Sequence, residues 1–199
     1  MRYFKYIAID NYQIIREKSV KFFLKNYSSI RTSVFQQFDW TEYVKHCPEI
    51  LTAFSRYDLE PYTGFIYIIY KQEESPLHTD YVNSAYNKCR INIPVINCEF
   101  SKTFFYKKVS SALAQERIMQ NDIMTDPDNE SNSKPIDYIK YDENDFSLEK
   151  VDEVVVDRPT VMRVQEPHRV MIDSNHVPRV VLTIHTRKDP VYLLNDDTC

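Results

Sequence analysis

Glycine is almost absent from this chain of 199 residues, in which Gly64 is the single one. Phosphate-cradling loops and the turns of dinucleotide-binding folds need several glycines, because the backbone must approach the ligand closely. Neither a GxGxxG nor a GxxxxGK[ST] pattern occurs. Nucleotide-binding folds of these two kinds are therefore excluded, and turns must be made by Asn, Asp, Ser and Pro.

Closely spaced cysteines and long apolar runs are also missing. The cysteines Cys47, Cys89, Cys98 and Cys199 include no CxxC pair, which predicts free thiols in a reducing compartment and argues against a zinc site. No apolar run approaches the length of a membrane span, and MRYFKYIAID lacks the apolar region and cleavage site of a signal peptide. We therefore expect a cytoplasmic globular protein without a membrane segment.

What the chain has in abundance is aromatic residues, 14% of the total, with a net charge of only −4. This composition is typical of one folded domain with a substantial core, and it gives no indication of a nucleic-acid partner. Apolar periodicity favours a mainly β fold with flanking helices that cover the outer face of a sheet. The spacing predicts helices over 11–27, capped by Asp10, and over 41–55, interrupted at Pro48, and strands over 3–9, 64–71, 89–96 and 102–108.

Three residues predict a metal site. His78 and Asp80, in LHTDY, are two positions apart and point to the same side of an extended segment. His168 opens a later apolar strand. Two imidazoles and one carboxylate on one face of an octahedron leave three positions open, an arrangement that suits non-haem Fe(II). Taken singly, an HxD pair can arise by chance, and a lone strand histidine is more often a surface or core residue.

Arg179 opens a second apolar strand eleven positions after His168. The two runs are separated by a polar, proline-ended break at 173–178, which predicts a hairpin with its turn near Ser174 and Asn175. In that register Arg179 lies about 7 Å deeper than His168, at roughly 3.3 Å per residue. That offset is about the length of a short dicarboxylate held between a metal and a guanidinium.

His78-x-Asp80, His168 and Arg179, in this order on a strand-rich chain, resemble the 2-oxoglutarate and Fe(II)-dependent dioxygenases. The segments CRINIPVI, PHRV and PRVVLTIH resemble compact members found in bacteria and phages, with some likeness to the aspartyl/asparaginyl hydroxylases. The resemblance covers residues 60–110 and 150–188. It implies a double-stranded β-helix (jelly-roll, cupin-like) core, and it implies Fe(II), 2-oxoglutarate and dioxygen as cofactor and cosubstrates.

The same resemblance implies an oxidoreductase. His78, Asp80 and His168 would be the catalytic metal ligands, and Arg179 would bind the far carboxylate of 2-oxoglutarate. The cosubstrate would be converted to succinate and carbon dioxide while an unidentified organic substrate is hydroxylated. Halogenases of this family lack the carboxylate ligand, so Asp80 argues against halogenation.

Further candidate cofactor contacts come from strand alternation. Arg90 and Asn92 share one face of CRINIPVI, where two polar residues indicate a ligand-lined interior. They are candidates for the near carboxylate of 2-oxoglutarate, unless one of them faces solvent at a sheet edge. Tyr67 and Tyr70 lie on opposite faces of their strand, so at most one lines the pocket, and Tyr70 is the candidate.

The whole chain is predicted to be one domain, residues 1–199. Helical support spans about 1–58, the β-helix core about 60–110 and 150–190, and an acidic insertion about 111–150. From Asn121 to Glu153 there are eleven acidic residues and three lysines, which makes this segment either a solvated surface or a lid. A short helix is expected over 111–119. Two alternatives stay open: a non-catalytic jelly-roll module, and a cupin-like metal enzyme that does not use 2-oxoglutarate.

Overall fold

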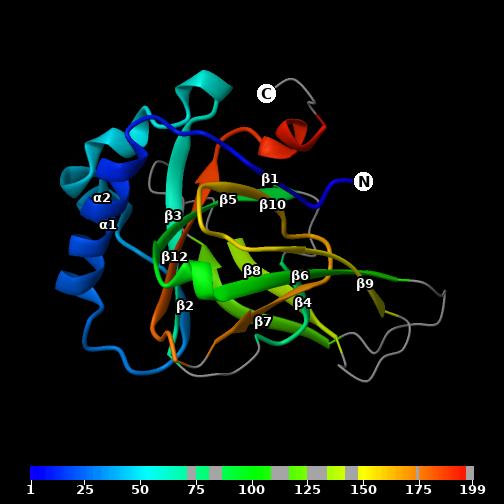
Figure 1. Ribbon diagram of the computed structural model, residues 1–199. Coiled ribbons are helices and arrows are strands. Elements are labelled where there is room, and N and C mark those ends of the chain that lie inside the picture. Colours follow the sequence, from blue (N-terminus) through cyan, green and yellow to red (C-terminus); the bar gives the residue numbers. More distant parts are fainter. Residues whose placement is uncertain are drawn as a thin grey trace.

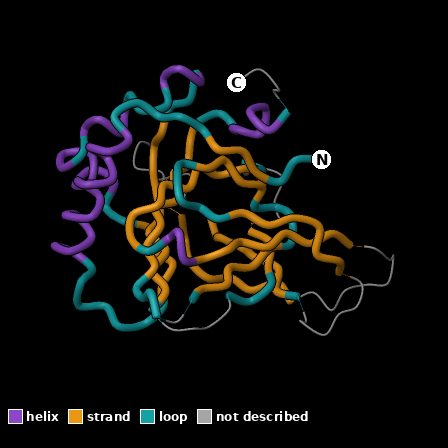
Figure 2. The backbone as a smooth tube through the Cα atoms, viewed as in Figure 1, coloured by secondary structure: helices purple, strands orange, loops and turns teal. Residues whose placement is uncertain are grey.

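The structure, a computed structural model, describes residues 1–70, 75–80, 87–108, 117–124, 134–141, 148–173 and 175–195. Within these residues the strands form two six-stranded sheets in which every pair is antiparallel. The longer helices lie on one side of this β-rich body (Figures 1 and 2). The mainly β prediction with flanking helices is confirmed.

The first sheet has the strand order β1-β10-β5-β12-β3-β2. Its central strands carry Ile, Val and Leu on the face turned toward the helices, and these side chains form the largest buried cluster. The strands are β1 (Phe4–Tyr6), β10 (Thr160–Arg163), β5 (Cys89–Ile96), β12 (Arg179–Thr186), β3 (Pro61–Ile69) and β2 (Val34–Gln37).

The second sheet has the order β7-β8-β4-β11-β6-β9. Its strands are β7 (Arg117–Met124), β8 (Lys134–Lys140), β4 (His78–Asp80), β11 (His168–Ile172), β6 (Ser101–Lys108) and β9 (Leu148–Val154).

Eight of these strands pair in a nested way. In chain order they are β3, β4, β5, β6, β9, β10, β11 and β12, and the first pairs with the last, the second with the second-last, and so on inward. This nesting is the jelly-roll arrangement, because two antiparallel ribbons folded together place alternate strands in opposite sheets. The predicted double-stranded β-helix core is therefore present in the chain's own strand pairing.

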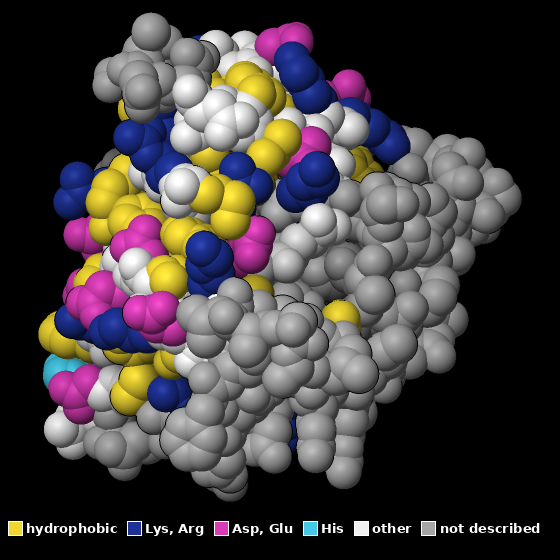
Figure 3. All heavy atoms as spheres, turned by 90° about the vertical axis from the view of Figure 1, so that its right-hand side faces the viewer, with side chains coloured by type: hydrophobic (Ala, Val, Ile, Leu, Met, Phe, Trp, Pro, Cys, Tyr) yellow, Lys and Arg dark blue, Asp and Glu magenta, His cyan; other side chains and the backbone are white. Residues whose placement is uncertain are grey.

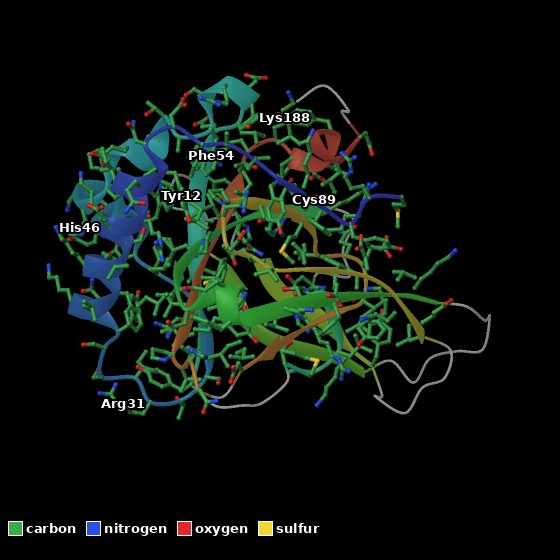
Figure 4. All side chains as sticks on the ribbon, viewed as in Figure 1. Tyr12, Arg31, His46, Phe54, Cys89 and Lys188 are labelled. Carbon is green, nitrogen blue, oxygen red and sulfur yellow. The ribbon has the colours of Figure 1, made fainter. Side chains whose placement is uncertain are left out.

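The helices are short and cover the outer face of the first sheet (Figure 1). α1 (Tyr12–Asn26) and α2 (Trp40–His46) are followed by the 3-10 helices η1 (Pro48–Leu51) and η2 (Ser55–Tyr57). Pro48 ends the second helix as predicted, because proline cannot donate the helical hydrogen bond. Figure 4 shows Tyr12 and Phe54 where the helical layer meets the sheet, and His46 at its outer side. The 3-10 helices η3 (Cys98–Phe100) and η5 (Pro190–Leu194) lie at strand ends.

Four predictions of local structure are wrong. Asp10 does not cap α1: Asn11 holds the cap position in the left-handed conformation without a side-chain hydrogen bond, and Asp10 pairs with Arg56. Residues 117–119, predicted to end a helix, begin β7; residues 111–116 of that prediction lie outside the described part of the chain. The strand predicted over 3–9 is limited to Phe4–Tyr6.

The fourth is the hairpin of residues 168–186. β11 pairs with β4 and β6, whereas β12 pairs with β3 and β5, so these consecutive strands run in different sheets (Figure 1). The break at 173–178 is long enough to cross between sheets stacked about 10 Å apart. Both strands still turn one face to the interior of the sandwich.

Gly64 lies in β3, where Phe38 packs against the backbone. A Cβ at this position would be 2.5 Å from Phe38 Cζ and 3.2 Å from Ile184 Cδ1. The single glycine therefore makes room for a buried aromatic ring under the helices. Of the helices described, none has the length and apolarity needed to cross a membrane.

Candidate metal centre

The second sheet brings His78, Asp80 and His168 together. β4 and β11 are antiparallel neighbours, and His168 stands directly opposite His78 in the register. The ring centroids of these histidines are 4.5 Å apart. One nitrogen or oxygen atom from each of the three residues lies within 4.8 Å of the other two. Alternation along β4 places Asp80 on the same face as His78.

Hydrogen bonds fix which ring nitrogen of each histidine can bind a metal. His78 Nδ1 lies 2.6 Å from the Pro76 carbonyl, and His168 Nδ1 lies 2.8 Å from the Glu166 carbonyl. A carbonyl can only accept a hydrogen bond, so each Nδ1 carries the hydrogen and, in the neutral rings, the lone pair is on Nε2, a common arrangement for metal-ligating histidines. His78 Nε2 is 3.2 Å from Asp80 Oδ1. Adjacent ligands at about 2.1 Å from a metal are about 3 Å apart, so this pair is spaced for one ion.

Burial and mutual charge set the protonation of the cluster. Burial and the neighbouring His78 lower the pKa of His168 to about 4, so its ring is neutral at pH 7. Burial would lower the pKa of His78, but the hydrogen bond and charge of Asp80 raise it overall. Burial opposes ionisation of Asp80, yet the hydrogen bond from His78 and the nearby positive charges, Arg90 among them, lower its pKa. A cation in this position would replace the proton that His78 and Asp80 share.

The cluster lines a cavity of about 220 Å³ between the two sheets. Arg179 also lines it, from β12 of the opposite sheet, and is 2% exposed. Its Nε donates a 2.7 Å hydrogen bond to Ser101 Oγ, while its Nη1 is buried and has no hydrogen-bond partner among the described residues. A buried guanidinium N–H without a partner is costly unless a ligand accepts from it. This N–H is suited to donate a hydrogen bond to the carboxylate of a ligand.

Of the other three predicted cofactor contacts, one lines the cavity and two do not. Asn92 lines the cavity, where its Oδ1 accepts a 3.0 Å hydrogen bond from Thr183. Arg90 is fully buried next to the cavity, with Nη1 donating to the carbonyls of Asn87 and Cys89, and it does not contribute to the cavity lining. Tyr70 also lies outside the lining and packs against the core beneath the helices.

Tyr67 lines the cavity in place of Tyr70. Burial raises the pKa of Tyr67, while the charge of Arg179 and a hydrogen bond with the Ser75 side chain act against this rise. Ile66 and Ile68 have the parity of Tyr70 and pack under the helices, whereas Phe65 and Ile69 have the parity of Tyr67. Both faces are apolar in the sequence, so alternation limited the tyrosines to one inward residue without selecting it.

Ser101 and Thr103, on the inward face of β6, were missed as site residues. The alternation of SKTFFYKK placed them on one face, but nothing in the sequence indicated that β6 would oppose β12.

No protein-family model matches the chain, and no curated protein matches its sequence. Similar solved structures include the non-heme alpha ketoglutarate dependent epimerase SnoN from nogalamycin biosynthesis, at 12% identity and a TM-score of 0.43, covering 99% of this chain and 85% of that chain. Another is SnoN in complex with Fe3+, alpha ketoglutarate and nogalamycin RO, at 11% identity and a TM-score of 0.39, covering 99% and 86%. At TM-scores below 0.5, we infer neither fold nor function from this likeness. The likeness to aspartyl/asparaginyl hydroxylases stays a prediction from sequence.

Proposed function

We propose that this chain is an Fe(II)- and 2-oxoglutarate-dependent dioxygenase that hydroxylates an organic substrate. The observation that carries the proposal is the content of one cavity. It holds a cluster of two imidazoles and a carboxylate, and it also holds a buried arginine with an unsatisfied N–H. The first group suits Fe(II), and the second suits the far carboxylate of a dicarboxylate cosubstrate.

The donor set fits iron through its chemistry. His78 and His168 would each offer Nε2, since their Nδ1 atoms are hydrogen-bonded to backbone carbonyls. Asp80 would offer one carboxylate oxygen and offset one positive charge of the ion. Its presence also occupies the position that a halide would need, which favours hydroxylation over halogenation.

Arg179 would bind the far carboxylate of 2-oxoglutarate. Its planar guanidinium stays charged when buried, and Ser101 holds its Nε so that Nη1 is directed away from that contact. Tyr67 and Asn92, which also line the cavity, would add a hydroxyl and an amide. When bound, iron and 2-oxoglutarate supply the oxidising power, with dioxygen consumed and succinate and carbon dioxide released.

The described part of the acidic insertion includes a strand next to β4, which supports its proposed role as a lid. Residues 111–116, 125–133 and 142–147 of the insertion lie outside the described part of the chain. β8 pairs directly with the metal-binding strand β4, with Lys140 opposite His78. A segment attached to β4 could alter access to the cavity when substrate binds.

The test is an anaerobic titration of purified protein with Fe(II) and then 2-oxoglutarate, followed by visible absorption. We expect a weak metal-to-ligand band that is lost in His168→Ala. Iron binding without this band would favour a cupin-like enzyme, and failure to bind iron would leave a non-catalytic jelly-roll module. Under air, a product heavier by one oxygen atom supports hydroxylation, whereas an isomer of unchanged mass would contradict it.

A further inference from the structure

The cavity that holds the metal ligands is small for the reaction proposed above. Pockets for drug-sized ligands span about 300–1,000 Å³, whereas this cavity has about 220 Å³ and would be filled largely by the cosubstrate. A second cavity of about 590 Å³ lies at the rim of the sandwich. Its lining residues include Tyr3, Lys107, Tyr141, Gln165, Glu166 and Pro167.

The second cavity is lined by residues that lie next to His168 in the chain. Glu166 and Pro167, which line it, directly precede His168, and the Glu166 carbonyl is the partner of His168 Nδ1. Tyr3, from the segment that leads into β1, packs against Phe105 with ring centroids 5.3 Å apart. The Phe105 ring lies 6.2 Å from the ring of His168. Two aromatic rings therefore connect the cavity wall to a proposed iron ligand.

The inward face of β6 runs past both cavities. Ser101 holds Arg179, Thr103 lines the first cavity, and Phe105 stands opposite His168 in the register. Lys107 follows two residues later on the same face, about 7 Å beyond Phe105 at roughly 3.3 Å per residue. The second cavity is thus on the side of the metal centre opposite to Arg179.

The charges around the second cavity favour a monoanion. Lys107 is exposed and makes no hydrogen bond or ion pair with any described residue. Glu166 lines the same cavity and contributes a carboxylate to it. The Lys107 ammonium next to this carboxylate suits a single negative charge better than two. In Figure 3, basic and acidic side chains are interspersed on the described part of the face shown. That part of the face therefore has no continuous basic surface to which a polyanion could bind.

We propose that the second cavity binds the primary substrate, and that this substrate is a small carboxylate with an apolar or aromatic body. Lys107 holds the carboxylate, and the rings of Tyr3 and Tyr141 hold the body. The hydroxyl of Tyr3 makes no hydrogen bond to a described residue and can donate to the same carboxylate. This assignment rests on the dioxygenase function proposed above.

The experiment uses the full chain and two probes of nearly equal shape, phenylacetate and its neutral amide, phenylacetamide. Dissociation constants are measured by NMR titration of wild type, Lys107→Gln and Lys102→Gln. Lys102 is the matched control, because it lies on the outward face of the same strand and pairs with Glu153 at 2.7 Å. We expect phenylacetate to bind wild type and the control alike and to bind Lys107→Gln about tenfold more weakly. Phenylacetamide should bind weakly to all three.

A second measurement places the probe relative to the metal centre. Mn(II) is added in place of Fe(II), its binding is followed by EPR, and broadening of the phenylacetate ring protons is recorded. Broadening that disappears in His168→Ala supports the substrate site. Phenylacetate binding that is equal in Lys107→Gln, or absent in wild type, would overturn the inference. So would binding without broadening on Mn(II)-loaded protein. If Mn(II) itself does not bind, the dioxygenase proposal fails, and this outcome is recorded separately by EPR.

Discussion

Replacing Arg179 with glutamine tests the cosubstrate site most directly. The substitution removes the guanidinium from a cavity that it shares with the proposed metal ligands, and it leaves a shorter, uncharged polar side chain. Arg179 is 2% exposed, so bulk solvent screens its charge only weakly. It supplies none of the three candidate ligand atoms, and Arg179→Gln should therefore bind Fe(II) as wild type does.

The expected magnitude follows from burial. Truncating one partner of a buried, hydrogen-bonded charge pair costs about 2–5 kcal/mol. At about 1.4 kcal/mol per factor of ten, 2-oxoglutarate affinity should fall about 30-fold to several thousand-fold. Arg179→Lys should lie between wild type and Arg179→Gln, because lysine keeps the charge but loses the planar fork. Ser101→Ala should also weaken binding, since Ser101 Oγ accepts from Arg179 Nε at 2.7 Å.

The assay is anaerobic calorimetry of 2-oxoglutarate on Fe(II)-loaded protein, after Fe(II) binding has been measured for each variant. Arg158→Gln is the control, because it removes the same charge from an exposed arginine paired with Asp157. Wild-type 2-oxoglutarate affinity in Arg179→Gln, with folding and Fe(II) binding intact, would refute the reasoning. A loss of equal size in Arg158→Gln would instead indicate a general charge effect.

Three further predictions concern other parts of the chain. Gly64→Ala should lower the free energy of unfolding in urea by about 1–3 kcal/mol, because its Cβ would be 2.5 Å from Phe38 Cζ; a similar loss in a Phe38→Leu background would argue against this clash. Burial, with the charge of Arg90, lowers the pKa of His185 well below 6.5. As pH falls below that value only the unfolded chain gains this proton, so stability should drop by up to about 1.4 kcal/mol per pH unit. In His185→Gln, the free energy of unfolding measured in urea at several pH values should fall less steeply as the pH is lowered. The same slope in the variant and in wild type would contradict this role of His185. Asp80→Ala should weaken Fe(II) binding in calorimetry, and unchanged affinity would remove Asp80 from the ligand set.

Strand alternation predicted much of the site. His78 and Asp80 on one face of a short strand, and Asn92 on the inward face of β5, were readable from a period of two residues. Alternation also limited the tyrosines of β3 to one inward residue. It did not select between them, and Tyr70 lies on the face of Ile66 and Ile68, which packs under the helices.

Pairing between distant strands was not readable in the same way. The apolar runs around His168 and Arg179 are compatible with a hairpin and equally with two strands in different sheets. A local apolar pattern predicts which face of a strand is buried, but it does not predict which other strand it pairs with. Ser101 became a partner of Arg179 only because β6 and β12 face one another across the sandwich.

The sequence by itself determined the mainly β class, the positions of α1 and the strands β5 and β6, and the three residues able to bind a metal. These features follow from local periodicity and side-chain chemistry, and both depend only on residues close together in the sequence. Only the tertiary structure decided that His78 stands opposite His168, that Arg179 enters their cavity from the other sheet, and that a second cavity begins beside Glu166. Those facts depend on contacts between residues far apart in the chain, and such contacts are set by the packing of the whole sandwich.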